Sequence, residues 1–158
     1  MSSRNAVIAL ILFLSLALSG PSAAFSSDYE GLKVSPVKKA TTTTNGQRIS
    51  YPKTDSPEVT VVTVDIPPGS ETGWHLHPIP VYAYVLSGVL TVELEDGKQN
   101  IFKEGDSIIE VVNAPHNGRN LGKAPVKLVV FYTGVEGTPN TVKVQHKDRH
   151  GDMVTGGQ

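Results

Sequence analysis

Three histidines have a spacing that could bind a metal ion. His75 and His77 are separated by one residue, and His116 follows much later, directly after Pro115. Side chains two apart in a strand point to the same face, so the imidazoles of the pair can converge on one point. With His116 on a neighbouring strand, the three would form a facial ligand set with positions open for water or substrate. The alternative for the pair is the polar edge of a strand.

The elements that must position these histidines are short β-strands. From Glu58 onward, β-branched and apolar runs alternate with Gly, Pro and Asn turn signals, and no stretch of 12 residues after residue 24 has helical periodicity. Such runs predict an all-β sandwich or barrel, and a jelly-roll closure hides strand edges. The predicted strands cover residues 59–66, 81–86, 89–94, 99–102, 107–112, 126–133 and 141–144.

Two motifs around the histidines resemble those of the cupin superfamily. The stretch from Gly69 to Gly88 contains Gly, five residues, His-x-His and a strand that ends in Gly. The stretch from Gly105 to Asn120 contains Gly-Asp, a strand, Pro, His, three residues and Asn. The resemblance implies a small single-domain cupin of the type-2-like kind. Its fold would be a double-stranded β-helix, a jelly-roll-like barrel with a metal ion inside.

One position departs from the family pattern. Cupins usually have a glutamate four residues after the second histidine as a fourth ligand, but Val81 stands there. Tyr82 beside it should point to the opposite face of the strand. We therefore expect a site of three histidines. Glu71, four residues before His75, is a candidate ligand or acid and base, although Gly73 interrupts the strand between them. An exposed loop glutamate is the alternative.

Two residues after the third histidine are further candidates. Arg119 and Asn120 follow His116 closely and could orient a ligand or bind an anionic substrate. A metal-bound histidine usually needs a partner for its other nitrogen, which is one role for such a residue. The alternatives are a surface charge for Arg119 and a turn residue for Asn120.

Composition excludes several classes of function. The chain of 158 residues has a formal net charge of −1 and no basic run interleaved with aromatics. It therefore lacks the field that nucleic acids or anionic membrane surfaces would need, and we expect no nucleic-acid partner. It has no cysteine. Thiolate metal sites, disulfides and cysteine nucleophiles are thereby excluded.

The first residues resemble a secretory signal. Arg4 precedes an apolar run over residues 6–18, and small residues precede a cleavage point after Ala24. The run is short for a membrane span, which needs about 20 residues. We expect an exported protein, periplasmic or secreted, with no membrane attachment after cleavage. An uncleaved N-terminal anchor is the alternative.

The expected organisation has four parts. Residues 1–24 form the signal peptide, residues 25–57 an N-terminal arm with an edge strand near Thr41, residues 58–145 the cupin domain and residues 146–158 a polar tail. The edge strand could pair with a neighbouring copy, and a homodimer is therefore among the expected partners.

The expected cofactor is one divalent transition metal ion. Neutral imidazole suits Zn, Cu, Fe and Ni, and the sequence does not choose among them. Three functions remain open. The first is a metal-dependent, dioxygenase-like enzyme acting on a small molecule, and the second is a non-catalytic module that binds a small ligand or metal. In the third, the metal only stabilises the barrel.

Overall fold

The computed structural model describes residues 31–147 and 153–154. The expected signal peptide, the first residues of the arm and most of the polar tail lie outside these residues. The chain divides into two units, and the second, Pro36–Gln158, carries every strand described below. Within the described ranges no helix is long and apolar enough to span a membrane.

Strands are the only regular secondary structure in the described part of the chain. Most coincide with runs of β-branched and apolar residues, which favour extended backbone. In chain order they are β1 (Pro57–Ile66), β2 (His75–Leu76), β3 (Val81–Ser87), β4 (Val89–Leu94), β5 (Gln99–Lys103), β6 (Ser107–Ile109), β7 (His116–Arg119), β8 (Val126–Val135), β9 (Val142–Lys143), β10 (His146–Lys147) and β11 (Met153–Val154).

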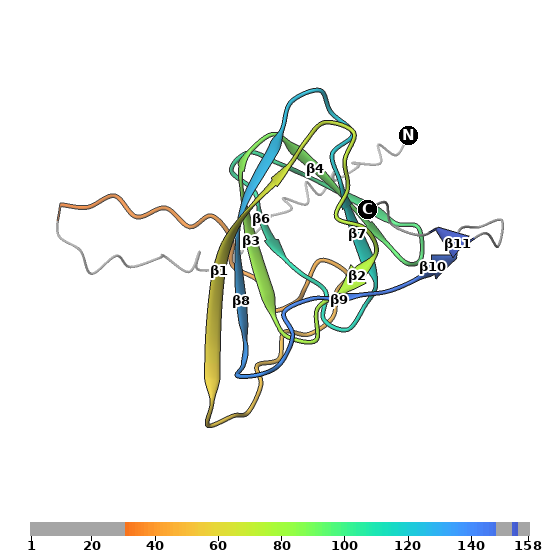
Figure 1. Cartoon of the computed structure of the whole chain (residues 1–158). Helices are drawn as coiled ribbons and strands as arrows, with labels where there is room; N and C mark the ends of the chain where they lie inside the picture. Colours follow the sequence, from red (N-terminus) through yellow and green to blue (C-terminus); the bar gives the residue numbers. More distant parts are fainter. Residues whose placement is uncertain (1–30, 148–152, 155–158) are drawn as a thin grey trace, which may run out of the picture. The chain divides into compact units, whose positions relative to one another are not determined.

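Two antiparallel sheets form the barrel. One has the strand order β1-β8-β3-β6 and the other β5-β4-β7-β2-β9, while β10 and β11 pair separately. Figure 1 shows the strands of the first sheet, with β1, β8 and β3 side by side, facing the segment that holds β7 and β2. The all-β prediction is confirmed, and the topology is consistent with a double-stranded β-helix.

The core lies between the two sheets. Along β3 the buried residues are Val81, Ala83 and Val85, which alternate with more exposed side chains. This period of two places one face of each strand inside. Apolar side chains of β4, β6 and β8 complete the core, so burial of aliphatic surface holds the sheets together.

The strands that carry the histidines differ from the sequence prediction. The predicted strand 107–112 ends at Ile109, and His116 begins a strand of its own, β7. Strand β2 has two residues, so His77 lies just beyond it and pairs with Val112 in an isolated parallel bridge. Pro78 follows His77 and has no amide hydrogen, which limits continuation of the ladder.

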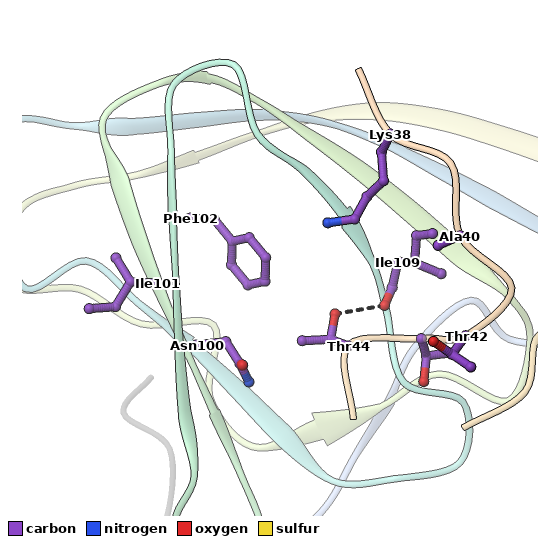
Figure 2. A pocket seen from close by; sticks show the side chains of 9 residues that line it. Lys38, Ala40, Thr42, Thr44, Asn100, Ile101, Phe102 and Ile109 are labelled. Atoms are coloured by element: carbon purple, nitrogen blue, oxygen red, sulfur yellow. Dashed lines mark hydrogen bonds between the residues drawn. The ribbon is translucent and has the colours of Figure 1, made fainter. Parts of the chain in front are cut away.

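The N-terminal arm binds the segment after β6. The backbone N–H and the hydroxyl of Thr44 both donate to the carbonyl of Ile109, at 2.9 and 2.8 Å. The side-chain amide of Gln47 exchanges two hydrogen bonds with the backbone of Val112. Figure 2 shows a pocket of about 360 Å³ between the arm, with Lys38 and Thr44, and the side chains of β5, with Phe102 and Asn100.

Gly88 connects β3 to β4 at a position that only glycine fits. Its φ is +83°, and a Cβ there would lie 2.6 Å from the carbonyl oxygen of Pro125. Gly105 has a similar φ of +89° but open space around it. We expect Gly88→Ala to lower the free energy of unfolding by about 3 kcal/mol or more, because it adds a clash to the left-handed strain.

Urea unfolding of Gly88→Ala and Gly105→Ala separates the two contributions. Gly105→Ala should cost only the strain of the left-handed backbone, about 1–2 kcal/mol. Equal losses in the two variants would contradict the packing that we assign to Gly88.

Candidate metal centre

The sheet register brings two of the histidines together. His75 of β2 and His116 of β7 are direct cross-strand partners, so their side chains leave the same face at neighbouring positions. His77 lies on the same side, two residues after His75. The three ring centroids are 4.4 to 5.0 Å apart. The ligand atoms of the three histidines all lie within 4.8 Å of one another, so the group could hold a metal ion.

Each imidazole is oriented by a backbone carbonyl. The Nδ1 atoms of His75, His77 and His116 lie 2.7, 2.7 and 3.0 Å from the carbonyl oxygens of Gly73, Asn140 and Ala114. A carbonyl only accepts, so each Nδ1 carries the hydrogen and donates it. The lone pair of each neutral ring is therefore on Nε2. This arrangement fixes both the tautomer and the ring orientation, as is usual for metal-binding histidines.

Burial keeps the three rings neutral. His77 and His116 expose 4% and 2% of their surface. Desolvation is the main cause that lowers the pKa of all three histidines, and it lowers the pKa of His77 to about 3. The Nε2 atom of His116 is buried without a hydrogen-bond partner. A buried nitrogen of this kind costs free energy unless it is paired, and a metal ion would pair it.

The histidines open into a small cavity of about 60 Å³. Aliphatic side chains from both sheets, such as Val92 and Leu128, form much of its wall. Tyr132 lies against His77 with ring centroids 5.6 Å apart. Burial raises the pKa of the Tyr132 hydroxyl, so this group stays protonated at neutral pH. The cavity therefore combines three nitrogen donors with an apolar surround.

Glu110 lines the same cavity, and sequence reasoning missed it. Its Oε2 atom lies 3.6 Å from Nε2 of His116, and its side chain is 13% exposed. Burial raises the pKa of this carboxyl group to about 7, and the electrostatic interaction with His75 lowers it to a smaller extent. The inward orientation of Glu110 was readable from the sequence, but its position beside the histidines was not. Glu110 is two residues from Ile108 in a strongly apolar run, so strand alternation points both inward.

Residues 62–132 match the family model described as the cupin domain. The matched stretch runs from β1 to β8 and includes His75, His77 and His116. No curated protein matches the chain.

Solved structures resemble the chain over about half of its length. An oxalate oxidase structure is 24% identical over 54% of this chain and 46% of its own, with a TM-score of 0.47. A Klebsiella pneumoniae protein with a double-stranded β-helix domain is 23% identical, with 58% and 86% covered and a TM-score of 0.46. The polyketide cyclase RemF from Streptomyces resistomycificus is 21% identical, with 54% and 60% covered and a TM-score of 0.48. The chain thus matches less than half of the oxalate oxidase.

Glu71 and Arg119 lie together outside the lining of the cavity. The carboxylate of Glu71 is 3.2 Å from Nε of Arg119 and accepts a hydrogen bond from Asn117 at 3.1 Å. Gly73 has a φ of +74°, which interrupts the strand between Glu71 and His75. On β7, Asn117 and Arg119 alternate with His116 and therefore leave the other face. Neither Glu71 nor Arg119 lines the histidine cavity.

Asn120 is a buried connector between two loops. It is 1% exposed, and its Nδ2 donates to the carbonyls of Ile66 and Ala124 at 2.8 and 2.9 Å. Its Oδ1 accepts from the backbone N–H of Gly122 at 3.0 Å. All three bonds end on backbone groups, and Asn120 is not part of the cavity lining.

The stability of the metal-free protein should fall with acidification below pH 6.5. His77 has a folded pKa of about 3 against an ordinary 6.5, so over this range the unfolded chain binds a proton that the folded chain does not. His75 and His116 are shifted in the same direction. Glu110 opposes them between pH 4.5 and 7, because its raised pKa stabilises the fold at lower pH. Because acidification destabilises the fold through three histidines and stabilises it only through Glu110, we expect a net loss of stability.

Urea unfolding in the presence of a chelator, followed by Trp74 fluorescence from pH 7 to pH 4, measures this loss. The decrease in unfolding free energy per pH unit should be smaller in His77→Gln than in the wild type. A midpoint that stays constant or rises on acidification would contradict the burial of neutral imidazoles.

Proposed function

We propose that this protein is an exported, metal-dependent cupin enzyme that acts on a small molecule at the centre formed by His75, His77 and His116. The observation that carries the proposal is the convergence of three Nε2 lone pairs whose Nδ1 hydrogens are all donated to backbone carbonyls. Three neutral imidazoles form a ligand set that suits Zn, Cu, Ni or Fe. They leave coordination positions free for water or substrate.

The residues of the chain have distinct tasks in such a reaction. A bound ion would supply Lewis-acid or redox chemistry. The three histidines would hold it, and their carbonyl partners would keep the rings from rotating. The apolar part of the wall lowers the local dielectric constant, which strengthens electrostatic interactions inside the cavity. Tyr132 offers a hydroxyl group with its proton retained at neutral pH. The proposed chemistry is oxygenase-like, since three histidines leave coordination positions for both oxygen and a chelating substrate.

The size of the cavity limits the substrate. About 60 Å³ corresponds to roughly two water molecules at about 30 Å³ each. A ligand of drug size would need several hundred cubic ångströms. We therefore propose a substrate that presents only a few atoms to the centre, such as a small oxygen-bearing chelator, with the rest of the molecule at the rim.

The same small cavity favours a second candidate function. A barrel that holds an ion and one or two small molecules can be a metal-binding module without turnover, and cupin-type folds alone do not decide between these functions. Both candidates need the three histidines. They differ in whether a bound molecule is consumed.

Oxygen uptake by the purified protein separates the two candidates. The protein is stripped with a chelator and reloaded with Fe(II), Cu(II) or Zn(II), and it is then screened against small diketones, flavonols, thiols and catechols. Consumption of oxygen that depends on a redox metal and disappears in His77→Ala supports the enzyme. Stoichiometric metal binding with no consumption in any combination would overturn the enzyme and favour the module.

Export and self-association complete the proposal. The apolar run 6–18 and the small residues before Ala24 support a cleaved signal and a periplasmic or secreted protein.

Exposed apolar side chains on the outer face of β1 and β8 support a homodimer. Val61 and Phe131 are cross-strand partners there, and each exposes more than 40% of its surface (52% and 41%).

A further inference from the structure

The position at which cupins usually have a ligating glutamate has a cross-strand neighbour. Val81 occupies that position at the start of β3. Strands β3 and β6 pair with Tyr82 opposite Ile109 and Ala83 opposite Ile108. One step further in this register, Glu110 lies opposite Val81, and its backbone N–H donates to the carbonyl of Val81 at 3.0 Å. Opposed residues of an antiparallel pair leave the same face of the sheet.

That face is the interior of the barrel. Val81 is 1% exposed, and so is Ile108, which precedes Glu110 by two residues on the same face. The carboxyl group of Glu110 lines the histidine cavity. An acidic group is therefore available inside the barrel, one strand away from its usual position.

The distance between Glu110 and His116 suits a shared ion. Imidazole nitrogens and carboxylate oxygens bind such ions at about 2.0–2.2 Å. Two donors of one ion at tetrahedral or octahedral angles are then about 3–4 Å apart. Oε2 of Glu110 and Nε2 of His116 are 3.6 Å apart. The same Nε2 has no hydrogen-bond partner, so the pair is not joined directly.

A buried carboxylate needs a cation to offset its desolvation. Arg119, the charged residue closest in sequence to His116, pairs with Glu71 and Glu93 instead. Glu110 donates its backbone N–H to the carbonyl of Val81. A divalent ion between Glu110 and the histidines would compensate the charge and the orphaned nitrogen together.

The arm holds the backbone on both sides of Glu110. Thr44 donates twice to the carbonyl of Ile109, and Gln47 binds the backbone of Val112. With the bond to Val81, the arm and β3 together fix this stretch. A ligand on irregular backbone needs such support to keep its geometry.

We propose that Glu110 is a fourth protein ligand of the metal ion, so that the centre has three histidines and one glutamate supplied from beside β6 rather than from β3. This inference rests on the proposed function, since it needs an ion at the three histidines. With a fourth protein donor, an octahedral ion keeps two open positions instead of three. The substrate would then bind through at most two donor atoms, unless Glu110 dissociates.

The test compares Glu110→Gln and Glu110→Ala with Glu71→Gln, each loaded with one equivalent of Cu(II) or Co(II). Glu71→Gln is the matched control, because it removes a carboxylate that is near the histidines but bound to Arg119. We expect both Glu110 variants to change the Cu(II) EPR parameters and the Co(II) visible spectrum. Their metal dissociation constants should rise by at least about 10-fold. Glu71→Gln should match the wild type in all three measurements.

The outcomes separate this inference from the proposed function. Wild-type spectra and affinity in both Glu110 variants would overturn the assignment of Glu110 and leave the three-histidine centre intact. A wild-type protein that takes up no ion would overturn both. Thermal unfolding of the metal-free variants shows that each is folded, and Glu110→Ala provides a second folded variant if Glu110→Gln binds the ion through its amide oxygen.

Discussion

Replacing His77 with alanine should raise the dissociation constant for a divalent transition metal by more than about 100-fold. Loss of a partner outside the coordination sphere already costs about 10- to 100-fold, and loss of a direct ligand should cost more. His77 contributes a buried neutral imidazole whose Nδ1 is bound to the carbonyl of Asn140. No other histidine of the described cavity can replace its Nε2, since His75 and His116 are already in the group.

Chelator competition followed by metal analysis measures this effect. His150→Ala, which changes a residue outside the described part of the chain, is the control and should retain the wild-type affinity. The variant should also lose the increase in melting temperature that saturating metal gives the wild type, because an ion that binds only the folded state stabilises it. Retention of tight stoichiometric binding in His77→Ala would contradict the ligand assignment.

Replacing Asn120 with alanine should lower the free energy of unfolding by about 3–4 kcal/mol. The side chain is fully buried and makes three hydrogen bonds to backbone groups of Ile66, Gly122 and Ala124. Each buried polar group left without a partner costs about 1–3 kcal/mol, and part of this is recovered if water enters the space. The substitution should lower stability and leave metal affinity unchanged, since Asn120 does not line the cavity.

Denaturant unfolding and metal titration together test this role. Asn120→Asp should destabilise at least as much as Asn120→Ala, because a carboxylate would face the carbonyl oxygens of Ile66 and Ala124. At a temperature where Asn120→Ala is folded, its metal affinity should equal that of the wild type. A selective loss of affinity with unchanged stability would instead assign Asn120 to the ligand site.

The sequence predicted the fold because its signals are local. The β-branched run of β1 and the run of β4 are bounded by turn residues, and β4 (Val89–Leu94) has the predicted limits. The His-x-His spacing also identified a group that could hold a metal, because strand alternation is a property of neighbouring residues. Strand β7 was missed, since its residues His116 to Arg119 are polar and include a glycine, and only pairing with β2 and β4 extends them.

The roles of the two carboxylates near the site could not be predicted from local sequence patterns. Glu71 was a candidate because it lies four residues before His75 and would share its face in a continuous strand. The left-handed backbone of Gly73 interrupts that strand. Glu110 was overlooked because its link to the histidines depends on the β3–β6 register, which pairs it with Val81 across about 30 residues of chain. Register is a long-range property, and one sequence contains no direct measure of it.

The central claim is that the Nε2 atoms of His75, His77 and His116 bind one ion. Pulsed EPR of the wild-type protein with one equivalent of Cu(II) detects coordinated imidazoles through the remote Nδ1 nitrogen of each ring. We predict one tightly bound ion per chain with coordinated imidazole signals that decrease in each single histidine variant and vanish when all three are replaced. Stoichiometric Cu(II) with the same imidazole signals in the triple variant would contradict the account.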